Sequence, residues 1–157
     1  MKYKINLVCE VDAINEKQAK NLAQTLMIIE KSKVNVVNPI TIFNELKDVR
    51  QKSKEYFVSI ILNTQNEIIE TDIVSIGTLN TSIIHPREVF RRAIQLNGNA
   101  IIIAHNHPSG SLEPSIEDLN VTKRLSEAGK LLGITILDHL ILTQNAYMSF
   151  AEKHLLN

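Results

Sequence analysis

Two histidines and one aspartate stand at a spacing that suits a metal site. His105 and His107 belong to the run HNHP, and after a gap of seven residues Ser115 and Asp118 follow as Ser-x-x-Asp. Two imidazoles and one carboxylate can hold a divalent ion and leave one position open, as in a catalytic zinc site. A structural zinc ion usually has four protein ligands, often thiolates, and this chain has one cysteine.

A strand and a helix are expected to bring these side chains together. The apolar run 100–104 predicts a strand that is buried on both faces and ends directly at His105. Side chains two positions apart on a strand point to the same side, so His105 and His107 can converge. Ser115 is a natural N-cap, which places Asp118 in the first turn of a helix, where the helix dipole favours a carboxylate. Either pattern alone is usually structural, but their order along the chain favours a metal site.

A hydrolytic metal site needs a further group that moves a proton from water to the leaving amine, and a nearby carboxylate is the usual choice. Five glutamates are candidates: Glu55, Glu67, Glu88, Glu113 and Glu117. Glu113 and Glu117 are expected to face solvent, and Glu88 to serve a helix dipole. Glu67 follows a hairpin turn, and Glu55 opens a strand. The residues alone leave this choice open.

The rest of the chain alternates between strand and helix patterns. The predicted elements are strand 3–9, helix 13–30, a short helix from Pro39 to about Asp48, linker 49–54, strands 56–62 and 67–76 as a hairpin, helix 86–96, loop 106–114, helix 115–132 capped by Gly133, strand 134–142, strand 147–150 and a helical turn at 151–156. We therefore predict an α/β domain over 38–157, with a mixed sheet flanked by helices, and an N-terminal strand and helix extension over 1–37.

The composition suits one soluble globular domain of 157 residues with 44% hydrophobic residues. Seventeen basic residues balance seventeen acidic ones, so the net charge does not support nucleic-acid binding. The compact basic group is Arg87, Arg91 and Arg92. Cys9 is alone, which excludes an internal disulfide and fits a reducing cytoplasm. No run approaches the roughly 20 apolar residues that cross a bilayer, and the N-terminal residues do not resemble a signal peptide.

Two further histidines have less specific surroundings. His85 precedes a predicted helix start and is expected to be a surface or capping residue. His139 follows Asp138 on a predicted strand. An Asp–His pair there could support the metal site from behind a ligand, and a buried, hydrogen-bonded strand histidine is the more common arrangement.

The pattern H-x-H-x7-S-x-x-D resembles the JAMM motif of MPN-domain metalloproteases. Its wider context is similar to the RadC-like proteins, which are often labelled DNA repair proteins. The resemblance covers roughly residues 38–152, and the stretches that carry it are EYFVSIILNTQNEII, GTLNTSIIHPREVFRRAI, AIIIAHNHPSG and LDHLIL.

This resemblance implies an MPN (JAB, cytidine-deaminase-like) fold and one Zn²⁺ ion held by His105, His107 and Asp118. It implies that Ser115 binds or orients the water and helps to stabilise a developing oxyanion. It also implies that Glu55 is the general base, which decides a choice that spacing left open.

The expected function is that of a zinc-dependent metallohydrolase that cleaves a peptide or isopeptide bond in an unknown protein or peptide substrate. Two alternatives are an accessory factor that binds DNA in repair, recombination or mobile-element maintenance, and a catalytically silent MPN interaction domain. Longer RadC-like proteins carry an N-terminal helix-hairpin-helix-like region. About 37 residues precede the matched part here, without a Gly-rich hairpin signature, so we expect a short form that lacks this region.

Overall fold

The structure is a computed structural model that describes residues 38–77 and 84–156. The strand predicted over 3–9 and the helix predicted over 13–30 lie outside these ranges. Within them, the predicted α/β fold with a mixed sheet is confirmed.

Five strands form one sheet in the order β2-β1-β3-β4-β5. Their bounds are β1 Tyr56–Leu62, β2 Ile68–Ile76, β3 Ala100–Asn106, β4 Thr135–Leu142 and β5 Tyr147–Ser149. Neighbouring strands are antiparallel except β3 and β4, which are parallel. A parallel pair needs a long crossover, and α5 (Ile116–Leu132) provides it. The loop after β3 therefore leads straight to the start of α5.

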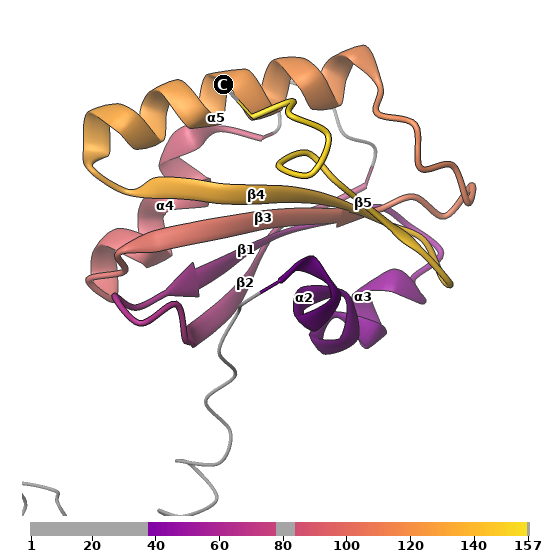
Figure 1. Cartoon of the computed structure of the whole chain (residues 1–157), viewed down its shortest axis with the longest axis horizontal. Coiled ribbons are helices and arrows are strands. Elements are labelled where there is room, and N and C mark those ends of the chain that lie inside the picture. The colour runs from indigo at the N-terminus through magenta and orange to yellow at the C-terminus, as the bar shows by residue number, and fades with distance from the viewer. Residues whose placement is uncertain (1–37, 78–83, 157) are drawn as a thin grey trace, which may run out of the picture. The chain divides into compact units, whose positions relative to one another are not determined.

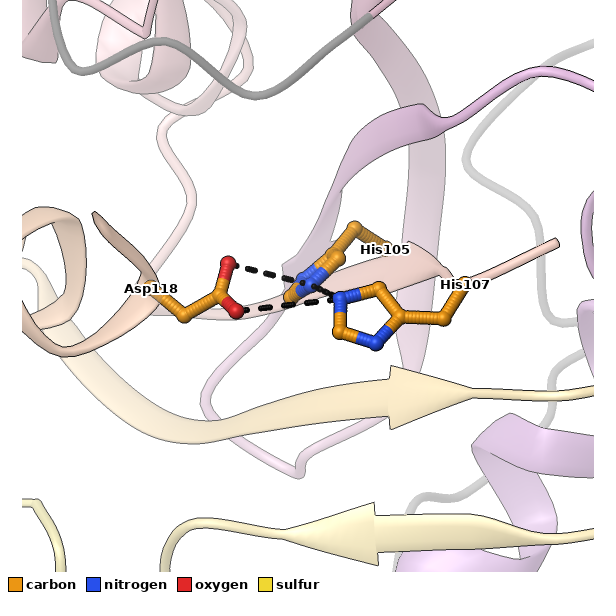
Figure 2. Close-up of side chains that lie close together, drawn as sticks. All are labelled: His105, His107 and Asp118. Atoms are coloured by element: carbon orange, nitrogen blue, oxygen red, sulfur yellow. Dashed lines mark hydrogen bonds and ion pairs between the residues drawn. The ribbon is translucent and has the colours of Figure 1, made fainter. Parts of the chain in front are cut away.

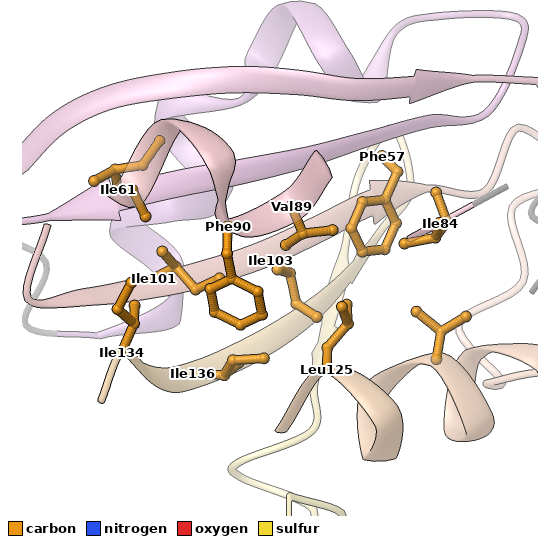
Figure 3. Close-up of a cluster of buried hydrophobic side chains, with 12 residues drawn as sticks. Phe57, Ile61, Ile84, Val89, Phe90, Ile101, Ile103, Leu125, Ile134 and Ile136 are labelled. Carbon is orange, nitrogen blue, oxygen red and sulfur yellow. The ribbon is translucent and has the colours of Figure 1, made fainter. Parts of the chain in front are cut away.

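Helices cover both faces of this sheet (Figure 1). α4 (Pro86–Gln95) and α5 lie on one face, and α2 (Pro39–Glu45) and α3 (Lys47–Arg50) lie on the other. Each face buries its own apolar cluster. Figure 3 shows the cluster under α4 and α5, where Phe57 and Phe90 pack among isoleucine, leucine and valine side chains. The opposite cluster packs Ile42 and Phe43 of α2 against β1, β3 and β4.

β3 lies in the middle of the sheet and is buried along its whole length. It runs two residues beyond the predicted end, through His105 and Asn106, which are both 0% exposed. His105 pairs with Phe57 of β1, and Asn106 pairs with Leu142 of β4. The end of β3 is therefore paired with a neighbouring strand on each side. Polar side chains are tolerated at this depth when they are hydrogen-bonded, and both of these side chains have hydrogen-bond partners.

Three predicted segments differ from the structure. The helix expected over 39–48 is two short helices that meet at Leu46. The segment 49–54 is not a linker, because α3 runs through Arg50 and the Arg50 guanidinium donates to the Gln144 carbonyl at 2.7 Å. The segment 151–156 is a turn and not a helix, since His154 has a φ of 56° that interrupts helical geometry. The hairpin and the helix 115–132 with its cap at Gly133 are confirmed, within one or two residues.

In the part of the chain that the structure describes, no helix is long and apolar enough to cross a membrane.

Close packing of α5 on the sheet predicts an unusual response to a glycine substitution. A Cβ atom at Gly129 would lie 2.5 Å from the Ile134 carbonyl oxygen and 3.2 Å from the Phe90 ring. Gly129→Ala should therefore destabilise the fold by about 2 kcal/mol in urea unfolding, although alanine favours a helix by about 1 kcal/mol. Glu127→Ala, at an exposed position of the same helix, is the control and should be neutral or stabilising. A more stable Gly129→Ala protein would contradict the packing.

Candidate metal centre

The predicted ligand side chains come together where β3 ends and α5 begins (Figure 2). His105 is the last residue but one of β3, His107 follows the strand with its side chain on the same side, and Asp118 reaches them from the first turn of α5. The Nε2 atoms of the two histidines are 2.9 Å apart. Asp118 Oδ1 lies 3.2 Å from His105 Nε2, and Asp118 Oδ2 lies 3.7 Å from His107 Nε2.

These separations suit a metal ion. Bonds of about 2.0–2.2 Å in a tetrahedral site place ligand atoms about 3.3 Å apart, and the three observed distances fall on both sides of that value. Two unprotonated nitrogens at 2.9 Å repel each other unless a cation lies between them. His105, His107 and Asp118 are therefore a group that could hold a metal ion.

Hydrogen bonds orient His107 and Asp118 so that an unprotonated nitrogen and a carboxylate oxygen face the centre of the group. His107 Nδ1 lies 2.9 Å from the Ser111 carbonyl oxygen and donates to it, which leaves Nε2 unprotonated. Asp118 Oδ2 accepts from the Ser115 hydroxyl at 2.7 Å and from the Ser115 backbone N–H at 2.8 Å. Oδ1 of Asp118 is then the oxygen that faces His105.

Ser115 is the N-cap of α5 and forms a capping box with Asp118. Its hydroxyl accepts a hydrogen bond from the Asp118 N–H at 3.1 Å and donates one to the Asp118 carboxylate. Ser115 thus positions a ligand. To donate to an oxyanion instead, the Ser115 hydroxyl would have to break its hydrogen bond to Asp118. The predicted role of Ser115 at an oxyanion stays a prediction.

The protonation states of His105 and Asp118 suit metal binding. Burial lowers the pKa of His105, so its ring is neutral at pH 7. Burial acts to raise the pKa of Asp118, yet that pKa lies well below its usual range, and the hydrogen bonds that the carboxylate accepts from Ser115 contribute to lowering it. A neutral imidazole and an ionised carboxylate are the forms that coordinate metals.

Glu55 lies within electrostatic reach of this centre. It directly precedes β1 and stands two residues before Phe57, the partner of His105 in the sheet, so the two side chains share a face. Glu55 is half-buried, and its charge acts to raise the pKa of His105, against the larger effect of burial.

The other four glutamates have different surroundings. Glu88 forms ion pairs with Arg87 and Arg91. Glu67 accepts a hydrogen bond from the Asn63 amide at 2.7 Å. Glu113 and Glu117 are exposed, as predicted. Among the five candidates, Glu55 is therefore the one that the fold brings toward His105.

Asn106 is a site residue that the sequence reasoning missed. Its Oδ1 accepts from the Tyr56 N–H at 2.7 Å, and its Nδ2 donates to the carbonyls of Lys52 and Lys54 at 3.1 and 3.0 Å. Two of these partners flank Glu55 directly. Asn106 therefore fixes the backbone around Glu55 to the strand that carries the histidines. A buried asparagine between two candidate ligands was the available signal.

His139 supports the site, but not through Asp138. Its Nε2 lies 2.9 Å from Nδ1 of His105. The Asp138 carboxylate instead accepts from the Ser149 hydroxyl at 2.5 Å and from the Ala151 N–H at 2.9 Å. Of the two arrangements considered for His139, the buried, hydrogen-bonded strand histidine is confirmed, and the Asp138 side chain points away because neighbouring residues on a strand face opposite sides. His85 is exposed and caps α4, as predicted.

A polar cleft of about 560 Å³ opens beside His107. Its lining includes Arg50, Lys52, Pro108 and Asn145, from α3, the segment between α3 and β1, and the loops after β3 and β4. A ligand in this cleft would lie next to the histidine pair.

The basic group on α4 is balanced by carboxylates. Arg92 makes two hydrogen bonds to Glu70, at 2.5 and 2.8 Å. Arg87 and Arg91 lie 3.2 and 3.8 Å from Glu88. These pairs reduce the positive potential that a nucleic-acid phosphate would meet.

A mixed α/β sheet whose central strand ends in a histidine pair facing an aspartate defines a metallohydrolase-like domain of the JAB type. The family model described as RadC-like JAB domain matches residues 36–155, so the chain belongs to this family. A UPF0758 protein of Alkaliphilus metalliredigens is 43% identical, over 94% of this chain and 70% of that protein. UPF0758 proteins of Caldanaerobacter subterraneus and Methanosarcina mazei are 46% and 38% identical, over 90% and 95% of this chain. The chain spans 61% and 69% of their lengths.

Removing the Asn106 amide should loosen the Glu55 segment. Asn106→Ala leaves the Tyr56 N–H and two carbonyls without their partner, so we expect a loss of about 2 kcal/mol in urea unfolding. The Tyr56 amide resonance should also shift in NMR spectra. Asn120→Ala, at an exposed position of α5, is the control and should do neither. An Asn106→Ala protein with wild-type stability and an unshifted Tyr56 resonance would contradict the anchoring role.

Proposed function

We propose that this protein is a zinc-dependent metallohydrolase of the JAMM type that cleaves a peptide or isopeptide bond in a protein or peptide substrate. The observation that carries the proposal is the convergence of two imidazole Nε2 atoms and one carboxylate oxygen, with Glu55 close by. Three protein ligands leave one position open for water or substrate, as in catalytic zinc sites.

His105, His107 and Asp118 would hold the zinc ion. When bound, zinc supplies a Lewis acid that acidifies water and polarises the scissile carbonyl. The chain has one cysteine, so a thiolate-rich structural zinc site does not fit this ligand set.

Glu55 would take the proton from the attacking water and deliver it to the leaving amine. Asn106 holds the backbone on both sides of Glu55, and so keeps that carboxylate on the face of the sheet where the histidines lie. Ser115 would keep Asp118 oriented through its hydroxyl and backbone N–H. The cleft beside His107 is the place where residues flanking the scissile bond would lie.

A DNA-binding accessory role has less support. Arg87, Arg91 and Arg92 are each paired with a glutamate, and the net charge of the chain is zero. A silent interaction domain would need neither the Glu55 carboxylate nor an anchor for its backbone.

Two substitutions separate metal binding from catalysis. Asp118→Ala removes a ligand, so the purified and zinc-reloaded protein should lose its metal in elemental analysis. Glu55→Gln leaves the ligands in place and should keep one zinc per chain. It should lose hydrolysis by at least about 100-fold, because a positioned general base contributes about that much. Glu113→Gln, at an exposed site, should retain both properties. A wild-type protein without a divalent ion after reloading would contradict the proposal.

The substrate can be sought without assuming its identity. Zinc-loaded wild-type protein and the Glu55→Gln variant are each incubated with a peptide library made from a bacterial proteome, and new N-termini are labelled and identified by mass spectrometry. We expect cleavage products in the wild-type sample alone. Equal product sets in both samples, at equal zinc content, would contradict peptide hydrolysis at this centre.

A further inference from the structure

His105 can coordinate a metal through Nε2 when its ring proton sits on Nδ1. Behind Nδ1 of His105, close polar contacts join this ring to His139 and then to Thr122. We propose that Thr122 and His139 form a chain of hydrogen bonds that fixes this proton, and are positioning residues that prepare His105 for metal binding. This inference rests on the metal site of the proposed function.

Thr122 determines which atom donates and which accepts in this series of hydrogen bonds. Its Oγ1 lies 2.6 Å from the Asp118 carbonyl oxygen, which has no proton, so the hydroxyl proton must lie between them. A hydroxyl has one proton. Toward His139 Nδ1, at 2.6 Å, Oγ1 of Thr122 can therefore act only as an acceptor.

The same reasoning, one proton for each neutral ring, applies next to His139 and then to His105. A neutral imidazole carries one proton, and His139 uses it on Nδ1 toward Thr122. Its Nε2 is then unprotonated and lies 2.9 Å from Nδ1 of His105, which must be the donor. The proton of His105 is thus on Nδ1, and the electron pair on its Nε2 is directed toward His107 and Asp118.

Packing keeps the His139 ring in this orientation. The ring is 0% exposed and stacks on Phe150, with centroids 4.5 Å apart and an angle of 21° between the planes. The Phe57 ring approaches at 5.8 Å with an edge-to-face geometry. A ring flip, which would put Cδ2 in place of Nδ1 and Cε1 in place of Nε2, would have to open this packed region.

The group that accepts the hydrogen bond from His105 is not one of the usual acceptors behind a metal-binding histidine. A metal-binding histidine usually donates its second N–H to a carboxylate, a backbone carbonyl or water. Here the acceptor is a neutral imidazole, which orients His105 without adding negative charge behind the ligand.

α5 carries both the ligand Asp118 and the positioning residue Thr122. Thr122 stands four residues after Asp118, so both side chains lie on one face of the helix. The helix that delivers the carboxylate ligand therefore also begins the chain that orients the histidine ligand.

The tautomers of metal-free protein labelled with ¹⁵N at histidine test the proposal directly. Long-range ¹H–¹⁵N NMR spectra distinguish Nδ1–H from Nε2–H rings. We expect Nδ1–H for His139 in the metal-free wild-type protein, and Nδ1–H for both His139 and His105 once zinc is bound. An Nε2–H tautomer of His139 would overturn the proposal, whatever the activity. An Nδ1–H tautomer of His139 in a protein that binds no zinc would instead contradict the proposed function and leave the hydrogen-bond chain intact.

Matched substitutions at Thr122 add a second readout. Thr122→Val removes the hydroxyl at nearly constant volume, so His139 should move its proton to Nε2 and force His105 into the Nε2–H form. Zinc affinity, measured by competition with a chromophoric chelator, should fall about 10- to 100-fold. Thr122→Ser keeps the hydroxyl and should retain the wild-type tautomers and affinity. Unchanged tautomers and affinity in a folded Thr122→Val protein would overturn the proposal. If that variant does not fold, the wild-type spectrum decides.

Discussion

The contact between the Asp118 carboxylate and the His105 ring is the interaction on which the rest of the site depends. Asp118 is 2% exposed and His105 is 0% exposed, and they approach to 3.2 Å. A carboxylate at this depth is costly unless donors or a cation compensate its charge. Ser115 supplies two donors, and the start of α5 adds the positive end of the helix dipole. A divalent ion would complete this compensation.

The fold delivers that contact through the parallel pairing of β3 and β4. The crossover between them is α5, so the first turn of α5 lies at the edge where β3 ends. His105 and His107 lie on the α5 side of the sheet, while Asn106, between them, points to the other side. There Asn106 bonds to Lys52, Lys54 and Tyr56. One short stretch of β3 therefore places two metal ligands on one face and secures the segment of the candidate base on the other.

Local patterns were sufficient for much of this architecture. The apolar run of β3, the hairpin and the Ser115 cap are local features, and the structure has them within one or two residues. Local reasoning failed where a long-range bond decides the outcome. β3 continues through His105 and Asn106 because their side chains bond to distant residues. Similarly, 49–54 is held by bonds to β3 and to Gln144, which no local pattern contains.

The same distinction applies to the site. The spacing of His105, His107 and Asp118 indicated one ligand set, since a strand end and a helix start give each residue a definite place. Glu55 came from a family resemblance, because its proximity depends on the pairing of β1 with β3. Thr122 was missed, because its contact with His139 joins α5 to β4 across the sheet face. The sequence left open whether Asp138 supports His139, because the two residues are neighbours, but the sheet turns the Asp138 side chain away toward Ser149.

X-ray absorption spectroscopy of zinc-loaded protein tests the central claim most directly, because it reports the ligand atoms themselves. We expect one zinc ion per chain with two imidazole nitrogens and oxygen ligands, at about 2.0–2.2 Å. Asp118→Asn should alter the oxygen contribution and leave the imidazole signal. A sulfur shell at about 2.3 Å, or an imidazole signal that persists when both His105 and His107 are replaced by alanine, would contradict it.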